Sequence, residues 1–421
     1  MSLLADLLSP LFDRRYASAE TRDNRPMRDL AHDLLTSRGE VSGMALARQI
    51  LDRYASMEDE NKRTFLEYLG RELDLDPDAV QVALETYRGD PSRRNYVTLM
   101  SASEPPRQEL FRRLNQVPGA TGKLVAMRAD LIRFADGDPA LARVESDLKH
   151  LFKSWFNRGF LVLRPMNWES PAHILEKITR YEAVHAIHSW EDLRRRLQPE
   201  DRRCFGFFHP VMPDEPLIFV QVALTKGIPG SIQGLLAEER ENLPVGEADT
   251  AVFYSISNCQ AGLAGISFGN SLIKQVVEDL SRDLPQLKTF VTLSPIPGLM
   301  AWMRSVGLES HMSNPETLGP LAGHYLLNAK DKSGRPLDPV ARFHLNNGAL
   351  VHAIHAKGDL SPNGIAQSGG AMVNYLYDLK RISRNHEDFA NNKKVVAAKD
   401  VQNLARTPLP ETQDSPADAG T

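Results

Sequence analysis

The sequence predicts an α+β protein in which an all-α N-terminal domain, residues 1–155, precedes a mixed α/β domain, residues 156–400. Up to about residue 155, apolar residues recur at helical spacing and not in alternation. Beyond Phe156, short β-branched and aromatic runs alternate with amphipathic helical stretches. A length of 421 residues agrees with two domains, because it exceeds what one ordinary core accommodates.

The N-terminal domain is predicted to be a helical bundle that serves as a scaffold or oligomerisation domain. Asp76-Pro77 and Asp138-Pro139 each place a capping Asp before a Pro at the first helical position. The sequence of this domain shows no repeat of fixed length, which argues against a solenoid. The helical stripes lie within Val41–Tyr54, Phe65–Leu73, Val80–Tyr87 and Leu124–Phe134.

Composition and charge narrow the class of protein. A hydrophobic fraction of 42%, a charged fraction of 25% and a net charge of −4 are typical of a globular protein that binds neither nucleic acid nor an anionic membrane. Two cysteines, Cys204 and Cys259, form neither a disulfide framework nor a zinc motif, so we expect a cytoplasmic protein. Residues 1–16 are interpreted as a docking helix, and residues 401–421 as a disordered, Pro-rich tail.

The first part of the α/β domain is predicted to form strands and short helices. Arg194, Arg195 and Arg196 fall on a predicted helix, where a solvated face is a commoner role than a phosphate contact. In chain order we expect a strand at 160–163, helices at 171–181 and 190–197, two strands within 203–225 joined by a turn at 213–216, and a loop with one short helix at 226–249.

Residues 251–298 contain the best candidate for a phosphate site. A strand leads through a Gly-rich turn into an amphipathic helix capped by Asn270, and a second strand follows. Backbone amides of such a turn, with the helix N-terminus, can bind an anion. Alternatively, Gly262, Gly265 and Gly269 allow the helix to pack closely on the strand. The pattern is neither a Rossmann fingerprint nor a P-loop.

Three side chains further along are candidates for chemistry. Ser294 follows the strand 290–293 in a rigid Pro-rich turn, where it could contact a ligand or simply cap the next helix. His344 precedes an Asn-Asn-Gly hairpin turn between two expected strands, although most such histidines are surface or core residues. Tyr377, with Tyr375, is expected on a helix beginning near Gly370. The carboxylates needed for a metal site are missing from this stretch.

Several segments in this order resemble the malonyl-CoA decarboxylase family. They cover roughly residues 30 to 395. The segments are WFNRGFLVLRPMNWESPAHILEKI, RRCFGFFHP, FYSIS, QAGLAGISFGNSLIKQVVEDL, LKTFVTLSPIPG, DPVARFHLNNGA and GGAMVNYLY.

The resemblance implies a GNAT-like catalytic domain, and it assigns site residues. It places the catalytic residues at Ser294, His344 and Tyr377. Animal members carry a glutamate where this chain has Ser267, so a role for that acid is not expected here. The implied CoA-binding loop consists of Ala264, Gly265, Ile266, Ser267, Phe268, Gly269 and Asn270, a spacing that also resembles the pyrophosphate loop of GNAT acyltransferases.

The implied function is conversion of malonyl-CoA to acetyl-CoA and CO2, in malonate or fatty-acid metabolism. The thioester delocalises the carbanion as an enolate, so no metal or organic cofactor is expected. We expect His344, with a pKa near neutrality, to protonate the enolate, and Ser294 to contact the carboxylate or the carbonyl. Tyr377 would support them, and the helical domain would form a homo-oligomer. The alternatives are an acyltransferase with an amine or carrier-protein acceptor, and a CoA-sensing regulatory protein.

Overall fold

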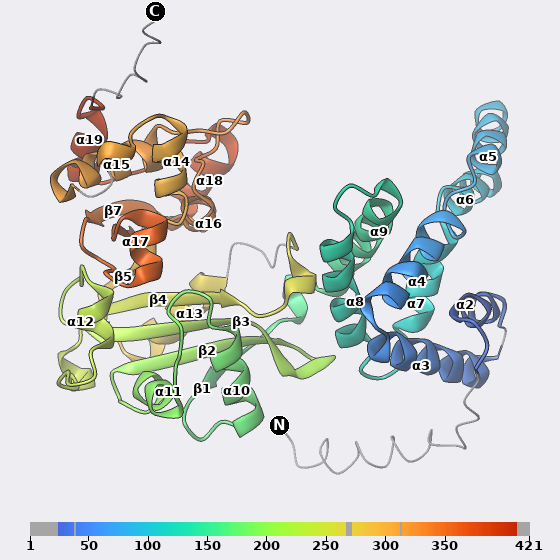
Figure 1. The fold of residues 1–421 in the computed structure, drawn as a ribbon, viewed down its shortest axis with the longest axis horizontal. Helices are drawn as coiled ribbons and strands as arrows, with labels where there is room; N and C mark the ends of the chain where they lie inside the picture. The colour runs from blue at the N-terminus through green and yellow to red at the C-terminus, as the bar shows by residue number, and fades with distance from the viewer. Residues whose placement is uncertain (1–23, 38, 267–271, 312–313, 411–421) are drawn as a thin grey trace, which may run out of the picture. The chain divides into compact units, whose positions relative to one another are not determined.

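The computed structural model describes residues 24–37, 39–266, 272–311 and 314–410, and the chain divides into two compact units between Leu151 and Phe152. The predicted docking helix at residues 1–16 lies outside the described residues. The helical first unit and the mixed sheet with helices of the second unit confirm the predicted α+β class (Figure 1).

The first unit consists of helices whose buried faces are lined by leucine, isoleucine and phenylalanine side chains. The predicted caps are confirmed: Asp76 accepts the Asp78 and Ala79 amides, and Asp138 accepts the Ala140 amide. The helices are α2 Met27–Thr36, α3 Glu40–Ser56, α4 Asp59–Arg71, α5 Pro77–Gly89, α6 Arg93–Ala102, α7 Pro106–Leu114, α8 Ala120–Phe134 and α9 Pro139–Trp155.

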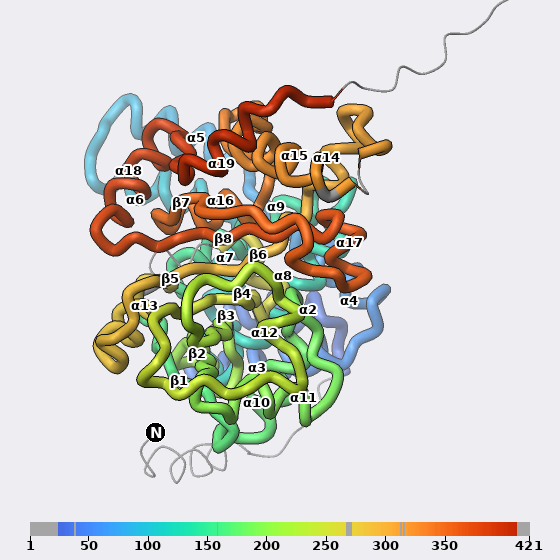
Figure 2. The backbone as a smooth tube through the Cα atoms, turned by 90° about the vertical axis from the view of Figure 1, so that its left-hand side faces the viewer, coloured from blue at the N-terminus to red at the C-terminus, as the bar shows by residue number. Residues whose placement is uncertain are grey.

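The second unit is organised around one sheet with the strand order β1-β2-β3-β4-β5-β8-β6, and β7 also pairs with β8. All pairs are antiparallel except β4 with β5. Figure 2 shows the strands following one another from β1 to β8. The strands are β1 Val162–Met166, β2 Arg202–His209, β3 Met212–Thr225, β4 Thr250–Asn258, β5 Thr289–Thr292, β6 Ser294–Pro295, β7 Leu350–His355 and β8 Met372–Leu376.

Helices cover the sheet and form a layer beside β7 (Figure 1). Apolar side chains of α10 and α11 pack on β2 and β3, and those of α12 pack against β4 and β5. The helices are α10 Ala172–Tyr181, α11 Trp190–Leu197, α12 Ile232–Leu236, α13 Leu272–Asp283, α14 Leu299–Ser305, α15 Pro315–Leu327, α16 Pro339–Asn346, α17 Pro362–Ser368, α18 Ile382–Asn392 and α19 Lys399–Arg406.

The predicted hairpin around Asn346-Asn347-Gly348 is wrong, because residues before it form helix α16. Asp338 and Pro339 start this helix with the same Asp-Pro signal that starts α5 and α9. Gly348 has φ +82°, and its amide bonds the Leu345 carbonyl, so the turn ends α16 and leads into β7. The cap at the start of the segment therefore outweighs the turn signal at its end.

The helix expected around Tyr375 and Tyr377 is also wrong. Tyr375 lies in strand β8 and Tyr377 directly follows it. Gly369 and Gly370 both have positive φ, which ends α17 before the chain extends along β7. Pairing with β7 thus decides the conformation of a segment whose local sequence also suits a helix.

Two smaller boundaries differ from the prediction. The turn expected at 213–216 lies inside β3, and Pro210 and Val211 form the connection, with irregular register where Phe207 and Phe208 of β2 pair with β3. The tail expected from residue 401 begins later, because α19 continues to Arg406 and buries Val401 and Ala405. Residues 411–421 lie outside the described residues.

The α16–β7 turn supplies a stability test. We expect Gly348→Ala to lower the free energy of unfolding by about 2 kcal/mol or more, because it combines an unfavourable φ with a Cβ that collides with the Ile382 carbonyl oxygen. Gly334→Ala is the control: φ is +78°, but no atom lies within 4 Å of the added Cβ, so about 1 kcal/mol is expected. Urea unfolding measures both, and equal losses would contradict the predicted collision.

Candidate active site

Strands β6 and β8 place a serine and two tyrosines on one face of the sheet. Ser294 is directly opposite Val373 in the β6–β8 pair, so their side chains share a face. Tyr375 is two residues beyond Val373 and continues along the same face, and Tyr377 follows in the same period. Ser294 is thus held by strand pairing and does not cap α14, whose N-cap is Gly298.

His344 lies over this face on the last turn of α16. Its Nε2 is 3.3 Å from Ser294 Oγ, and its Nδ1 is 2.7 Å from the Tyr377 hydroxyl. The Tyr375 ring stacks on the imidazole at 4.5 Å between centroids and an interplanar angle of 24°. The structure therefore brings together Ser294, His344 and Tyr377, and adds Tyr375 to them.

A threonine that the sequence did not suggest orients the serine. The Ser294 hydroxyl donates to Thr292 Oγ1 at 2.9 Å, and the Tyr375 amide donates to the same oxygen at 3.1 Å. With its one proton given to Thr292, Ser294 accepts from Nε2–H of His344. The neutral imidazole then carries its proton on Nε2, and Nδ1 accepts from the Tyr377 hydroxyl.

Burial decides whether His344, Tyr375 and Tyr377 are charged or neutral. It lowers the pKa of His344 to about 3, and it raises the pKa values of Tyr375 and Tyr377 well above their usual range. All three side chains are therefore neutral around pH 7. The expectation that His344 has a pKa near neutrality is wrong, because burial lowers the pKa and sequence spacing does not report burial.

The Gly-rich turn follows β4. Ala264 and Gly265 lie after a 3-10 turn at Ala261–Leu263, Gly265 has φ +70°, and Ile266 is buried. The other predicted loop residues, Ser267, Phe268, Gly269 and Asn270, lie outside the described residues. Helix α13 begins at Leu272.

Comparison with known proteins decides the family. A model of the malonyl-CoA decarboxylase C-terminal domain matches residues 159–316 and 308–415, and one of the N-terminal domain matches residues 73–156. The mitochondrial malonyl-CoA decarboxylase of Anser anser anser is 38% identical over 352 residues, which are 70% of this chain and 69% of the relative. The chain belongs to the malonyl-CoA decarboxylase family. The predicted resemblance is confirmed.

Solved structures of family members also match. The crystal structure of malonyl-CoA decarboxylase from Rhodopseudomonas palustris is 48% identical, with a TM-score of 0.86 over 90% of this chain and 98% of that chain. The protein from Agrobacterium vitis is 48% identical, with a TM-score of 0.85 over 90% of this chain and 99% of that chain. These structures share the helical unit and the mixed sheet with this chain.

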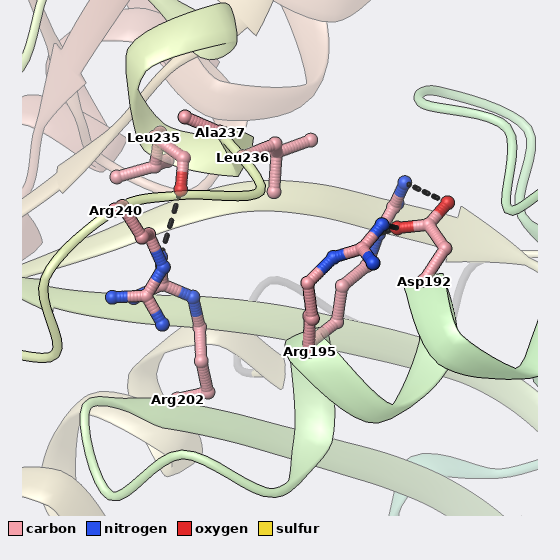
Figure 3. A pocket seen from close by; sticks show the side chains of 8 residues that line it. Asp192, Arg195, Arg202, Leu235, Leu236, Ala237 and Arg240 are labelled. Carbon is pink, nitrogen blue, oxygen red and sulfur yellow. Dashed lines mark hydrogen bonds and ion pairs between the residues drawn. The ribbon is translucent and has the colours of Figure 1, made fainter.

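A cluster of arginines beside α11 has a structural role. Arg196, predicted to lie on a solvated face, is instead buried, and it bonds Asp192 and the His185 carbonyl. Arg202 donates to the Leu235 carbonyl at 2.7 Å (Figure 3). The pocket between these side chains has room for about one water molecule. It shares no lining residue with the Ser294 site, and its guanidinium groups are already paired.

Within the described parts of the chain, no helix is long and apolar enough to cross a membrane, and no three His, Cys, Asp or Glu side chains are grouped to hold a metal ion.

The missed residues had weak signals in the sequence. Thr292 lies two residues before Ser294 and Tyr375 two before Tyr377, so strand periodicity would have placed each pair on one face once the strands were known. Asp338 carries the same Asp-Pro cap signal as Asp76, and it starts the helix that bears His344.

We expect His344 to remain neutral, with its proton on Nε2, from pH 5 to pH 8, because burial lowers the pKa to about 3. Nitrogen-15 NMR of histidine-labelled protein, assigned by difference from His344→Asn, measures this. In Tyr377→Phe the ring stays neutral but the Nδ1 signal shifts, because the bond from the tyrosine hydroxyl is lost. An imidazolium signal at pH 6 would contradict the assignment.

Proposed function

We propose that the chain converts malonyl-CoA to acetyl-CoA and CO2 at Ser294, His344 and Tyr377. Membership of the family makes the chain a decarboxylase. The contact of His344 with both Ser294 and Tyr377 in a buried site carries the assignment of residues. The reaction would serve malonate or fatty-acid metabolism.

The positions of the Gly-rich turn and Ser294 suit a long acyl-CoA. Strands β4 and β5 are parallel neighbours, paired from Thr250 to Phe253 and from Thr289 to Thr292. Ala264, Gly265 and Ile266 are the described part of the predicted loop. They follow the carboxyl end of β4, and Ser294 follows that of β5, so both lie toward the same end of the sheet. The loop amides and the start of α13 would bind the CoA phosphates, and pantetheine would reach to Ser294.

In the reaction, the C–C bond to the malonyl carboxylate breaks, CO2 leaves, and the electron pair passes into the thioester as an enolate. The thioester itself accepts the electrons, so the chemistry requires no metal or organic cofactor. A dry, neutral site favours this step, because the charge of the carboxylate spreads over the enolate as CO2 departs. Ser294 would hydrogen-bond the carboxylate or the developing enolate oxygen.

His344 would then protonate the α-carbon as a neutral imidazole. The Nε2 proton passes to carbon, and the Tyr377 hydroxyl gives its proton to Nδ1 through the 2.7 Å hydrogen bond. Nδ1 then returns this proton to the Tyr377 phenolate, and a proton from solvent restores Nε2–H, so that malonyl-CoA and one proton yield acetyl-CoA and CO2. This relay replaces the imidazolium donor expected from the sequence, because burial disfavours the charged ring.

Incubation with malonyl-CoA alone tests the function. We expect acetyl-CoA and CO2 without an acceptor, and losses of about 10²- to 10⁴-fold in kcat for Ser294→Ala, His344→Asn and Tyr377→Phe. Tyr254→Phe is the control: this buried tyrosine bonds Gln221 on β3, outside the site, and should retain activity. A requirement for an acceptor would favour an acyltransferase, and binding without turnover would favour a CoA sensor.

We also propose a homo-oligomer that forms through the helical unit. Helices α5 and α6 pack on each other and project from the rest of the unit (Figure 1). Helix α6 has no buried residue, and Tyr96, Val97 and Met100 are each at least half exposed. A contiguous apolar face of this kind is typical of a subunit interface.

Val97→Asp should shift the protein toward smaller species in sedimentation velocity, because it places a charge in the proposed interface. Thr98→Asp, on the neighbouring exposed position of α6, adds the same charge and should leave the assembly unchanged. The hypothesis fails if the wild-type protein sediments as a single chain, or if both variants behave alike.

A cytoplasmic location remains a proposal. It rests on two free and buried cysteines, which need no oxidising compartment. The curated relatives from Anser anser anser and Mus musculus are described as mitochondrial.

A further inference from the structure

Asp338 is a buried carboxylate at the start of the helix that bears His344. It is fully inaccessible to solvent, and its Oδ1 accepts the Ala341 amide at 2.8 Å as the N-cap of α16. Its second oxygen, Oδ2, is buried and has no hydrogen-bond partner. An ordinary N-cap is exposed and leaves no such oxygen behind, as Asp76 on α5 illustrates.

The second oxygen faces the turn that carries Ser294. Gly298 closes that turn, and a Cβ added there would be 3.8 Å from Asp338 Oδ2 and would collide with the Tyr325 hydroxyl. The Gly298 amide is close enough to favour the ionised carboxylate. One side chain therefore contacts the end of the Ser294 turn and the beginning of the His344 helix.

Within the described chain no cation forms an ion pair with this carboxylate, and Arg342 acts on it only from a distance. Tyr325 of α15 and Tyr375 of β8 face it as neutral groups, and Arg342 on its own helix donates to the Pro336 and Leu337 carbonyls. Burial raises the pKa of Asp338 to about 6, despite the opposing effect of the Ala341, Gly298 and Val340 amides and of Arg342.

Ionisation of Asp338 makes the free energy of unfolding depend on pH. Because the pKa of Asp338 is higher in the folded chain than in the unfolded one, the folded state binds more protons between about pH 4 and pH 6. The contribution of Asp338 to the free energy of unfolding therefore falls as the pH rises through that window. Above it, the ionised side chain lowers stability.

We propose that Asp338 is a positioning residue whose carboxylate couples the Ser294 turn to the His344 helix and so sets the separation of Ser294 Oγ and His344 Nε2. This inference rests on the proposed roles of Ser294 and His344. A neutral Asn or Ser caps a helix about as well as Asp does, so capping alone does not require a buried charge. A buried group that lowers stability beside reacting residues is typical of a functional site.

Asp338→Asn tests the proposal, because it keeps the shape and the cap and removes the charge. We expect the melting temperature to rise at pH 8 relative to wild type, and the difference to vanish near pH 4. At pH 8, kcat for malonyl-CoA should fall about tenfold through misplacement of the pair, with KM within about twofold. The wild type should lose kcat below about pH 6 as Asp338 is protonated.

In Asp338→Asn, the loss of kcat below about pH 6, which we call the acidic limb of the pH profile, should be absent. The 3′-phosphate of CoA also titrates near pH 6, but it is common to both proteins, so their difference reports Asp338. Asp338→Ser, a second neutral cap, should show the same changes in melting temperature and kcat as Asp338→Asn.

Asp76→Asn changes the matching Asp-Pro cap of α5 in the helical unit and should leave kcat and the pH profile unchanged. The inference is overturned if Asp338→Asn keeps the wild-type kcat and acidic limb, or if it loses stability and activity together at pH 8. His344→Asn separates the two hypotheses. If His344→Asn is inactive while Asp338→Asn behaves as wild type, the proposed function stands and the role of Asp338 falls. If wild type releases no CO2 from malonyl-CoA, the proposed function itself has failed.

Discussion

The burial of one imidazole ring is the constraint on which the site depends. His344 is held at both ring nitrogens and on one face, by Ser294, Tyr377 and Tyr375. Strands β6 and β8 present these three side chains on a common face, and α16 lays the ring over them. The sheet order and the α16 cap together produce a ring that is dry, neutral and oriented.

A neutral site suits a reaction in which charge disperses. Decarboxylation removes a localised negative charge, so a site that offers hydrogen bonds but no fixed cation stabilises the carboxylate less than it stabilises the spread charge of the transition state. The depressed pKa of His344 therefore agrees with the proposed chemistry, although it excludes the imidazolium that an exposed histidine would supply. In the proposed mechanism Tyr377 therefore takes part, because its hydroxyl can give a proton to Nδ1.

Buried charged side chains in the helical unit and beside the sheet are paired, whereas one near His344 has an oxygen without a partner. Arg107 in the helical unit bonds Asp74 and Asp147, and Arg196 beside the sheet bonds Asp192. Such paired groups fix the positions of helices without an uncompensated charge. Near His344, by contrast, Asp338 Oδ2 and the Tyr375 hydroxyl are buried without partners. Unsatisfied groups of this kind lower stability, and among the described residues they also occur at His185 Nε2, His209 Nε2 and Lys330 Nζ.

The sequence by itself determined the class of fold and the capped helices of the first unit, and through family resemblance it predicted Ser294, His344 and Tyr377 as site residues. These depend on local signals: an Asp-Pro cap needs only neighbouring residues. The tertiary structure alone decided that Tyr375 lies in a strand, because pairing with β7 overrides a segment whose local sequence also suits a helix. His344 lies on a helix because the Asp338-Pro339 cap outweighs the turn signal that follows it. The tertiary structure also decided the pKa of His344 and the unpartnered oxygen of Asp338, since burial is produced by residues far apart in the chain.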